Sequence, residues 1–139
     1  MGEIMDLHCN HWVQFNKELD KDRVRREFSK CLCGIAIYKG AELIGFCRLR
    51  ETNLKCCPEI TPWISSVFVK EKWRGRGYGK ALMDEICARA KGLGYGTVYL
   101  WTDQTPGFYE KLGFVFLKTV QKNEGGDALL YKRDLEFLL

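Results

Sequence analysis

The hydrophobic and polar positions of the chain predict a mixed α/β fold. Short runs rich in β-branched and aromatic residues are typical of strands, and they occur at residues 34–38, 42–50, 63–70, 97–102, 114–121 and 128–134. Leu82, Ile86 and Ala90 recur every four positions, which predicts a helix over residues 77–91. Another helical stripe, over residues 11–32, is made by Val13, Leu19, Val24, Phe28 and Leu32.

Glycine, proline and small polar residues separate these segments. Turn signals at residues 39–41 and 125–126 predict two hairpins. Residues 51–62 read as a loop, and Gly92 is expected to end the long helix. Thr105 can cap a short helix over residues 106–112, with Pro106 in its first position. The chain has 139 residues and no repeat or linker, so we expect residues 1–139 to form a single domain.

A glycine-rich run connects the predicted strand 63–70 to the long helix. It consists of Arg74-Gly75-Arg76-Gly77-Tyr78-Gly79-Lys80. Glycines at alternate positions let a backbone come close to a ligand. The first N–H groups of the helix point into the same space and carry the positive end of the helix dipole. The run therefore predicts an anion site suited to a diphosphate.

Two other phosphate-binding motifs were compared with this run. A Walker loop requires Ser or Thr after its lysine, and here Ala81 follows Lys80. A Rossmann fingerprint requires G-x-G-x-x-G, whereas these glycines are spaced G-x-G-x-G. Asp103, after the strand 97–102, stands near the place of a ribose-binding acid, but too few residues follow it for the remaining βαβ units.

Two motifs in register resemble the GNAT superfamily of N-acetyltransferases. Arg74-x-x-Gly77-x-Gly79 is similar to the acyl-CoA-binding signature of that superfamily, and residues 106–114, PGFYEKLGF, are similar to its short helix near the C-terminus. The resemblance covers residues 34–135. It implies a mixed, mostly antiparallel sheet flanked by helices, in which the strands 63–70 and 97–102 splay apart. It also implies acetyl-CoA as the co-substrate.

The resemblance further implies where the cofactor binds. Backbone groups of Val67, Phe68 and Val69 are expected to bond the pantetheine amides, and one of their N–H groups to polarise the thioester carbonyl. The pyrophosphate is expected on the amides of residues 74–80, and Phe108 is expected beside the sulfur.

Tyr109 is the candidate for the chemical step. Attack of an amine on a thioester expels a thiolate, and a positioned hydroxyl can protonate it. A free tyrosine has a pKa near 10 and a thiol a pKa near 8.5, so full transfer in water is uphill by roughly 2 kcal/mol. Either the donation occurs in the transition state, or the protein lowers the pKa of Tyr109.

No sequence motif identifies the general base or the pocket for the acceptor amine, so single residues are considered. Glu59 is the candidate base, acting directly or through water, and Glu51 and Asp103 are its rivals. A lysine-like amine loses its proton at a cost of roughly 4–5 kcal/mol at pH 7, and an α-amine at about 1 kcal/mol. Side chains that can line an acceptor pocket are those of Trp63, Trp101 and Arg48.

Composition narrows the class of protein. A net charge of +4, from 22 basic and 18 acidic residues, is too small to indicate nucleic-acid binding. Lys70, Lys72, Arg74, Arg76 and Lys80 form a basic cluster opposed in sequence only by Glu71. The seven cysteines, without a signal peptide or long apolar run, indicate reduced thiols in a cytoplasmic protein that contacts no membrane.

No metal, and no disulfide, is expected to be required. Cys31-x-Cys33 and Cys56-Cys57 lack the spacing of zinc ligands. His8, Cys9 and His11 are the remaining set that could chelate a metal.

Two functions remain open on the sequence. One is an N-acetyltransferase that acts on a primary amine of a small molecule or peptide by direct attack in a ternary complex, as a monomer or homodimer. The other is a non-catalytic acyl-CoA sensor on the same fold. Tyr109 favours the enzyme, because a sensor requires only the phosphate-binding run.

Overall fold

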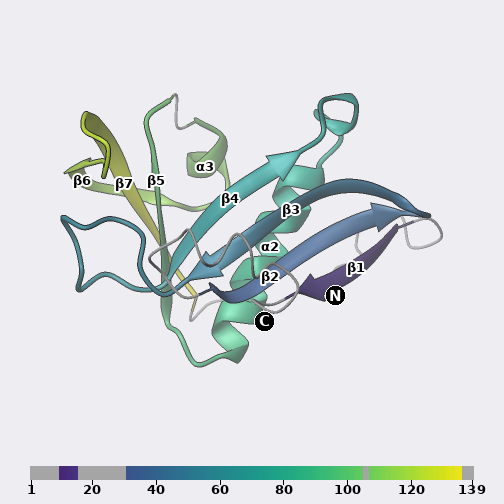
Figure 1. Cartoon of the computed structure of the whole chain (residues 1–139), viewed down its shortest axis with the longest axis horizontal. Helices are drawn as coiled ribbons and strands as arrows, with labels where there is room; N and C mark the ends of the chain where they lie inside the picture. Colours follow the sequence, from purple (N-terminus) through teal and green to yellow (C-terminus); the bar gives the residue numbers. More distant parts are fainter. Residues whose placement is uncertain (1–9, 16–30, 105–106, 136–139) are drawn as a thin grey trace.

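The computed structural model describes residues 10–15, 31–104 and 107–135, and in this part of the chain it shows one seven-stranded sheet. The strand order is β1-β2-β3-β4-β5-β7-β6. All neighbouring strands are antiparallel except β4 and β5, which are parallel. Figure 1 shows the long helix α2 crossing behind the sheet and the short helix α3 near the upper ends of β4 and β5. The predicted fold class, including the splayed central strands, is confirmed.

The first three strands form an antiparallel meander. They are β1 (Asn10–Phe15), β2 (Cys31–Lys39) and β3 (Glu42–Arg50). The predicted hairpin at residues 39–41 is confirmed, and Gly40 takes a φ of 61° in its turn. Such a left-handed conformation is inexpensive for glycine.

The helix predicted over residues 11–32 is wrong at both of its described ends. Residues 10–15 form β1, which pairs with β2 from Asn10 opposite Lys39 to Phe15 opposite Gly34. Leu32, the last position of the predicted stripe, lies inside β2. Leu19, Val24 and Phe28 lie outside the described residues. The backbone partners that make β1 a strand are more than 18 residues away along the chain, so local periodicity does not reveal them.

The middle of the chain forms a β-α-β unit. It consists of β4 (Trp63–Val69), a 3₁₀ turn η2 (Glu71–Trp73), α2 (Tyr78–Gly92) and β5 (Thr97–Thr102). Two parallel strands require a crossover connection, and α2 supplies it. The predicted boundaries of α2, residues 77–91, differ from the observed ones by one residue at each end. In the described part of the chain, a single parallel pair inside a mostly antiparallel sheet also excludes the doubly wound Rossmann arrangement.

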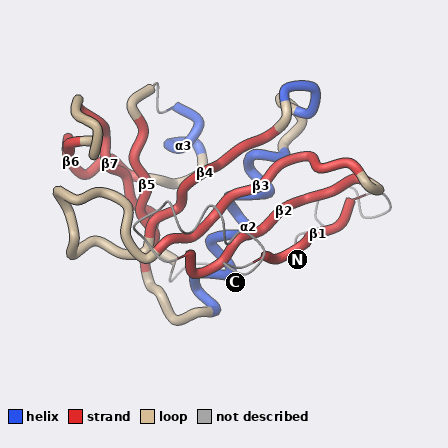
Figure 2. The backbone as a smooth tube through the Cα atoms, in the orientation of Figure 1, coloured by secondary structure: helices blue, strands red, loops and turns tan. Residues whose placement is uncertain are grey.

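The strands β4 and β5 separate soon after they meet. They share one ladder pair, Trp63 with Tyr99, and the N–H of Tyr99 donates to the carbonyl of Pro62 at 3.0 Å. Beyond this pair, β4 carries a bulge, because Cys47 of β3 stands opposite two residues between Ser65 and Phe68. A bulge bends the strand that carries it. The two strands therefore diverge, as Figure 2 shows.

The C-terminal part completes the sheet on the far side of β5. α3 (Gly107–Lys111) is followed by the hairpin of β6 (Val115–Gln121) and β7 (Asp127–Asp134). The turn of this hairpin contains Gly125 and Gly126, both with positive φ, which confirms its predicted position. Thr105 and Pro106, the predicted start of the short helix, lie outside the described residues.

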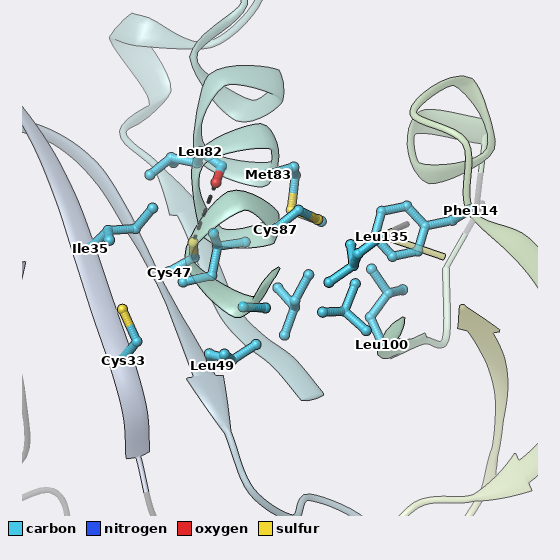
Figure 3. Close-up of a cluster of buried hydrophobic side chains, with 14 of the residues drawn as sticks. Cys33, Ile35, Cys47, Leu49, Leu82, Met83, Cys87, Leu100, Phe114 and Leu135 are labelled. Atoms are coloured by element: carbon cyan, nitrogen blue, oxygen red, sulfur yellow. Dashed lines mark hydrogen bonds between the residues drawn. The ribbon is translucent and has the colours of Figure 1, made fainter. Parts of the chain in front are cut away.

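Two groups of buried side chains hold the fold together. The larger group joins α2 to the sheet, with Ile35, Leu49, Leu82, Met83 and Leu135 fully buried in it. Figure 3 shows Cys47 pointing from β3 at the carbonyl oxygen of Leu82, 3.9 Å away, to which its thiol donates. The smaller group fills the space between the loop 51–62 and the hairpin β6–β7; its members are Leu54, Cys57, Trp63, Val120, Ala128 and Leu130.

We found no helix with the length and apolar character needed to cross a membrane among the residues that the structure describes.

We predict that Gly45→Ala destabilises the fold by roughly 1–3 kcal/mol, the usual range for overpacking. A Cβ on Gly45 would collide with the backbone oxygen of Phe68 and would lie 3.1 Å from the Cα of Val69. Both are backbone atoms of β4, so no side chain can move aside. Urea unfolding followed by circular dichroism measures the change.

The matched control for this prediction is Gly92→Ala. A Cβ at Gly92 meets no atom within 4 Å, and this residue ends α2. Its stability should be unchanged or higher by up to about 1 kcal/mol, because alanine favours helix over glycine. Equal stabilities of the two variants would contradict the tight approach of β3 and β4.

Candidate active site

The N-terminus of α2 presents uncapped backbone N–H groups. Gly77 is the N-cap residue, in a left-handed conformation with φ 89°, and no side chain caps the helix. The N–H of Ala81 donates to the carbonyl of Gly77 at 3.0 Å, which is the first bond of the helix. The N–H groups before Ala81 have no intrahelical acceptor. No acidic residue stands in the first turn, so the positive end of the helix dipole remains available to an anion.

The basic side chains around this terminus are held by protein groups. Lys72 forms a 2.8 Å ion pair with Glu42, and Lys80 forms a 2.7 Å ion pair with Asp84. The guanidinium of Arg76 lies over the ring of Trp73, with 5.1 Å between its carbon and the ring centroid. Glu42 and Asp84 thus neutralise part of the basic cluster, in addition to Glu71. From the sequence alone, only Glu71 was identified as an opposing charge. The candidate anion site is therefore made by the main chain more than by these basic side chains.

The edge of β4 that faces β5 has main-chain groups outside the sheet ladder. Val67, Phe68 and Val69 lie beyond the single pair of β4 with β5. Backbone groups of successive strand residues alternate in direction, and the N–H of Lys70 donates to the carbonyl of Ile44 in β3, so the groups of Phe68 face β3 and those of Val69 face the opening. The side chain of Arg74 binds one of these main-chain groups, since its Nε donates to the carbonyl oxygen of Val69 at 2.8 Å. The arginine of the glycine-rich run therefore ties that run to the end of β4.

A cavity of about 420 Å³ lies in the opening between β4 and β5. Strand β4 contributes Ile64, Ser65 and Val67, strand β5 contributes Leu100 and Trp101, and α3 contributes Tyr109. Figure 2 shows α3 standing in this opening. The end of β3 and the loop 51–62 complete the lining, so five segments meet where the two strands diverge.

Tyr109 is positioned by two neighbouring aromatic rings. Its ring centroid lies 5.2 Å from that of Phe108 and 6.2 Å from that of Phe114, both in edge-on arrangements. Burial of the phenol raises the pKa of Tyr109 above its ordinary value of 10.0, with a smaller contribution from Cys47. The alternative of a lowered tyrosine pKa is therefore wrong. Tyr109 keeps its proton at neutral pH and can act as a donor.

Phe108 connects the anion site to Tyr109. The ring of Phe108 lies so close to Gly79 that a Cβ at this glycine would be 3.0 Å from its Cζ atom. Phe108 is 45% exposed, so one face of the ring is open to a ligand. The absence of a side chain at Gly79 lets α3 approach the first turn of α2.

The predicted base and its rivals do not line the cavity. Glu51, Glu59 and Asp103 are exposed, and none belongs to its described lining. Asp103 forms a 2.9 Å ion pair with Lys122, and the hydrogen bond from Lys122 lowers the pKa of Asp103. A carboxylate with a lowered pKa is a weaker base, so the ion pair with Lys122 argues against Asp103 as the base.

The three predicted acceptor-pocket residues separate in the structure. Trp101 lines the cavity. Trp63 is fully buried in the smaller hydrophobic group, with its Nε1 donating to the carbonyl of Ile60 at 2.9 Å, so it has no surface to offer a substrate. Arg48 is only 5% exposed, lies over the ring of Phe46 and is not part of the described lining.

Three polar residues of the cavity were missed by the sequence interpretation. They are Arg50, Asn53 and Ser65, and the Nε of Arg50 donates to the Oγ of Ser65 at 2.7 Å. Arg50 stands two positions after Arg48 on the same strand, so both are expected on one face of β3. The alternation Phe46, Arg48, Arg50 was the available signal, but its meaning depends on where β4 and β5 separate.

No group of three or more His, Cys, Asp or Glu side chains is close enough to hold a metal ion in the described part of the chain. Of the predicted chelating set, His8 and Cys9 lie outside the described residues, and only the backbone of His11 is described.

Comparison with known proteins was made by sequence and by structure. The model of the Acetyltransferase (GNAT) family matches residues 2–114. This match reaches further towards the N-terminus than the motifs identified in the sequence. No curated protein matches the chain.

Several solved structures are similar to this fold. The ribosomal-protein-S18-alanine N-acetyltransferase from Escherichia coli is 13% identical, with a TM-score of 0.67 over 94% of this chain and 99% of that chain. A GNAT family acetyltransferase from Elizabethkingia anophelis with acetyl-CoA bound is 18% identical, with a TM-score of 0.65 over 91% and 98%. An aminoglycoside 6'-N-acetyltransferase complexed with coenzyme A is 19% identical, with a TM-score of 0.62 over 74% and 72%. At these identities the similarity establishes the fold.

We predict that Tyr109 titrates above pH 10, because burial disfavours its phenolate. Ultraviolet titration of wild type and Tyr109→Phe isolates this residue as the difference between the two curves. A folded pKa above the unfolded one stabilises the fold below pH 10, and this contribution is lost as pH rises through the folded pKa. Wild type should therefore lose more stability above pH 10 than Tyr109→Phe. Titration of Tyr109 at or below pH 10 would contradict its burial.

Proposed function

The chain belongs to the acetyltransferase (GNAT) family, and we propose that it moves the acetyl group of acetyl-CoA to a primary amine by direct attack in a ternary complex. The observation that carries the proposal is the placement of Tyr109. This phenol lines the cavity between β4 and β5 and connects through Phe108 to the uncapped end of α2. A proton donor and an anion site therefore lie along one continuous surface.

The residues present fit acetyl-CoA at two places. The N–H groups at the start of α2 suit a pyrophosphate, and Gly75, Gly77 and Gly79 keep side chains out of its way. The main chain of Val67 and Val69, beyond the pairing of β4 with β5, suits the pantetheine amides. The other residues of the run, Arg74, Arg76, Tyr78 and Lys80, would contribute through their backbone. Phe108 would lie beside the sulfur.

When bound, acetyl-CoA supplies an activated thioester carbonyl and a thiolate as the leaving group. An N–H of Val67 or Val69 then acts as the donor that polarises the carbonyl oxygen. Tyr109 would donate a hydrogen bond to the departing sulfur. Because burial raises the pKa of Tyr109, complete transfer to a free thiolate is unfavourable. The hydrogen bond from Tyr109 thus contributes in the transition state, while charge develops on the sulfur.

The amine must reach the cavity without its proton. We propose Glu59 as the base, and its exposed position outside the cavity lining means that it acts through water. The cost of deprotonation is about 1 kcal/mol for an α-amine and roughly 4–5 kcal/mol for a lysine-like amine at pH 7. The contribution of Glu59 is therefore larger for a lysine-like acceptor.

The acceptor contacts are proposed from the cavity. Trp101 offers an aromatic surface, and Arg50, Asn53 and Ser65 offer polar groups. Related structures carry names that include a ribosomal-protein alanine and an aminoglycoside as acceptors, so small-molecule and peptide amines are both within the proposal. The described cysteines are free thiols, which supports a reducing, cytoplasmic environment. We propose a monomer or homodimer.

Gly77→Glu should weaken CoA binding by at least about fivefold. It places a carboxylate at the N-cap of α2, and two like charges about 4 Å apart repel by roughly 1–4 kcal/mol at exposed sites. Isothermal titration calorimetry with CoA measures the effect.

Gly94→Glu is the matched control. Gly94 also has a positive φ, 101°, and it lies past the opposite end of α2 with open space at its Cβ position. The two variants thus share the same charge change and the same kind of backbone strain. CoA affinities of Gly77→Glu and Gly94→Glu that agree within error would overturn the assignment of the anion site.

Tyr109→Phe should lower kcat by roughly 10²–10⁴, the range of a lost general acid. CoA affinity and stability at neutral pH should change little, because the ring keeps its contacts with Phe108 and Phe114. The loss should shrink with an acyl donor that has a better leaving thiol. Acetyl transfer to a panel of amines, read as release of free thiol, measures kcat.

Tyr95→Phe is the control for this substitution, since Tyr95 lies past the C-terminal end of α2. It should leave kcat unchanged. A normal kcat in Tyr109→Phe would remove the proposed acid and leave the enzyme. Absence of turnover in wild type with every amine class, together with tight CoA binding, would favour the acyl-CoA sensor.

A further inference from the structure

Two adjacent thiols meet in the loop 51–62, outside the cavity and the anion site. The sulfur atoms of Cys56 and Cys57 are 3.2 Å apart. Cys56 is exposed, whereas Cys57 is 3% exposed and belongs to the smaller hydrophobic group. Cys33, Cys47 and Cys87, the other cysteines whose side chains the structure describes, are buried. The exposed thiol therefore has a second thiol directly behind it.

Hydrogen bonds give the two sulfur atoms different roles. The thiol of Cys56 donates to the carbonyl oxygen of Gln121 at 3.4 Å, so the contact between the sulfurs is made by the thiol of Cys57 donating to Cys56. Burial and this hydrogen bond raise the pKa of Cys57. Cys57 thus keeps its proton and donates to the sulfur of Cys56, and only Cys56 is exposed to a reagent in solvent. Cys56 is the nucleophile of the pair.

We propose that Cys56 and Cys57 form a two-thiol site that low-molecular-weight disulfides oxidise reversibly to a vicinal disulfide. The thiolate of Cys56 attacks one sulfur of the small disulfide, which forms a mixed disulfide and releases one thiolate. Cys57 loses its proton and attacks the sulfur of Cys56, which releases the second small thiol. Two electrons pass from the protein thiols to the small disulfide, and the two protons end on the two released thiols.

The positions of the two residues make this bond possible and easily reversed. Closing the pair requires the sulfurs to approach by roughly 1.2 Å, from the observed contact to a bond of about 2.05 Å. Adjacent Cα atoms are about 3.8 Å apart, below the usual range for disulfides of about 4.4–6.8 Å. A bond in such a short loop is strained and therefore readily reduced. Labile disulfides of this kind are the regulatory ones.

Oxidation would remove one of the hydrogen bonds that hold the loop 51–62 against the hairpin β6–β7. Asn123 holds the loop through its Oδ1, which accepts from the N–H of Lys55 at 2.8 Å, and through its Nδ2, which donates to the carbonyl of Asn53 at 2.9 Å. The thiol of Cys56 adds the bond to Gln121, and a disulfide sulfur has no hydrogen to donate. Asn53 lines the cavity, so a change in this loop reaches the acceptor side.

The site is tested on the full reduced protein in buffers of reduced and oxidised glutathione at about pH 8.5, near the ordinary pKa of a thiol. Samples are quenched with acid, alkylated and digested with trypsin. The peptide 56–70 contains Cys56 and Cys57 and no other cysteine. We expect this peptide to become resistant to alkylation and lighter by two hydrogens as the buffer becomes oxidising, and to recover when reduced glutathione is added back. A peptide that stays fully alkylated at every ratio would overturn the proposal.

Two variants separate the steps. Cys57→Ser keeps the nucleophile and removes the second thiol, so it should accumulate glutathione on Cys56. Cys56→Ser keeps a hydroxyl that can donate to Gln121. Its Cys57 is buried, so glutathione disulfide should not oxidise it at the same ratios, and it should be alkylated in full after the quench. A stable glutathione adduct on wild type, equal to that on Cys57→Ser, would show that the pair does not close and would overturn the vicinal disulfide.

The effect on the acceptor side rests on the proposed function. In the oxidised protein we expect KM for the amine to rise by roughly two- to tenfold, the scale of one lost hydrogen bond, with KM for acetyl-CoA unchanged. An unchanged KM for the amine would overturn the coupling between the loop and the cavity. The peptide measurement requires no turnover, so failure of the proposed acetyl transfer and failure of the two-thiol site give different results.

Discussion

The parallel pairing of β4 with β5 at one residue pair is the constraint on which the candidate site depends. The pair of Trp63 with Tyr99 keeps the two halves of the sheet together, and the bulge in β4 then turns this strand away from β5. The opening leaves main-chain groups of β4 outside the ladder and creates the cavity that Tyr109 lines. Without the divergence, the same residues would form an ordinary continuous sheet, with no room for a cofactor arm or an amine.

The crossover helix α2 places a candidate anion site at one end of this opening. α2 begins where the glycine-rich run ends, and its uncapped N–H groups lie at one end of the proposed cofactor path. Gly79 lets the ring of Phe108 lie on the first turn of α2, and Phe108 in turn packs edge-on against Tyr109. A missing side chain in the anion site thus positions the helix that carries the proton donor. The proposed phosphate site and the proposed acid Tyr109 therefore share one packing contact, through Phe108.

Charge and polarity near the site are arranged by residues distant in sequence. Glu42 and Asp84 pair with lysines of the basic cluster, so the anion site relies on backbone dipoles more than on free side-chain charge. The loop 51–62 is held by Asn123, from the turn of the hairpin β6–β7, and the same loop brings Asn53 to the cavity. The hydrogen bonds of Asn123 therefore help to position Asn53 in the cavity proposed to bind the amine.

Residues close together in the chain were enough to indicate the family, the glycine-rich run as a candidate phosphate site and Tyr109 as the candidate acid. The sequence also predicted most element boundaries, since turns with glycine and the periodicity of α2 are local signals. The strand β1, the burial of Trp63 and the cavity residues Arg50 and Ser65 were decided only by the tertiary structure. Each depends on which strands pair and where β4 leaves β5, and pairing between distant segments has no local signature. The direction of the Tyr109 pKa shift was decided in the same way, because burial is a property of the packed fold.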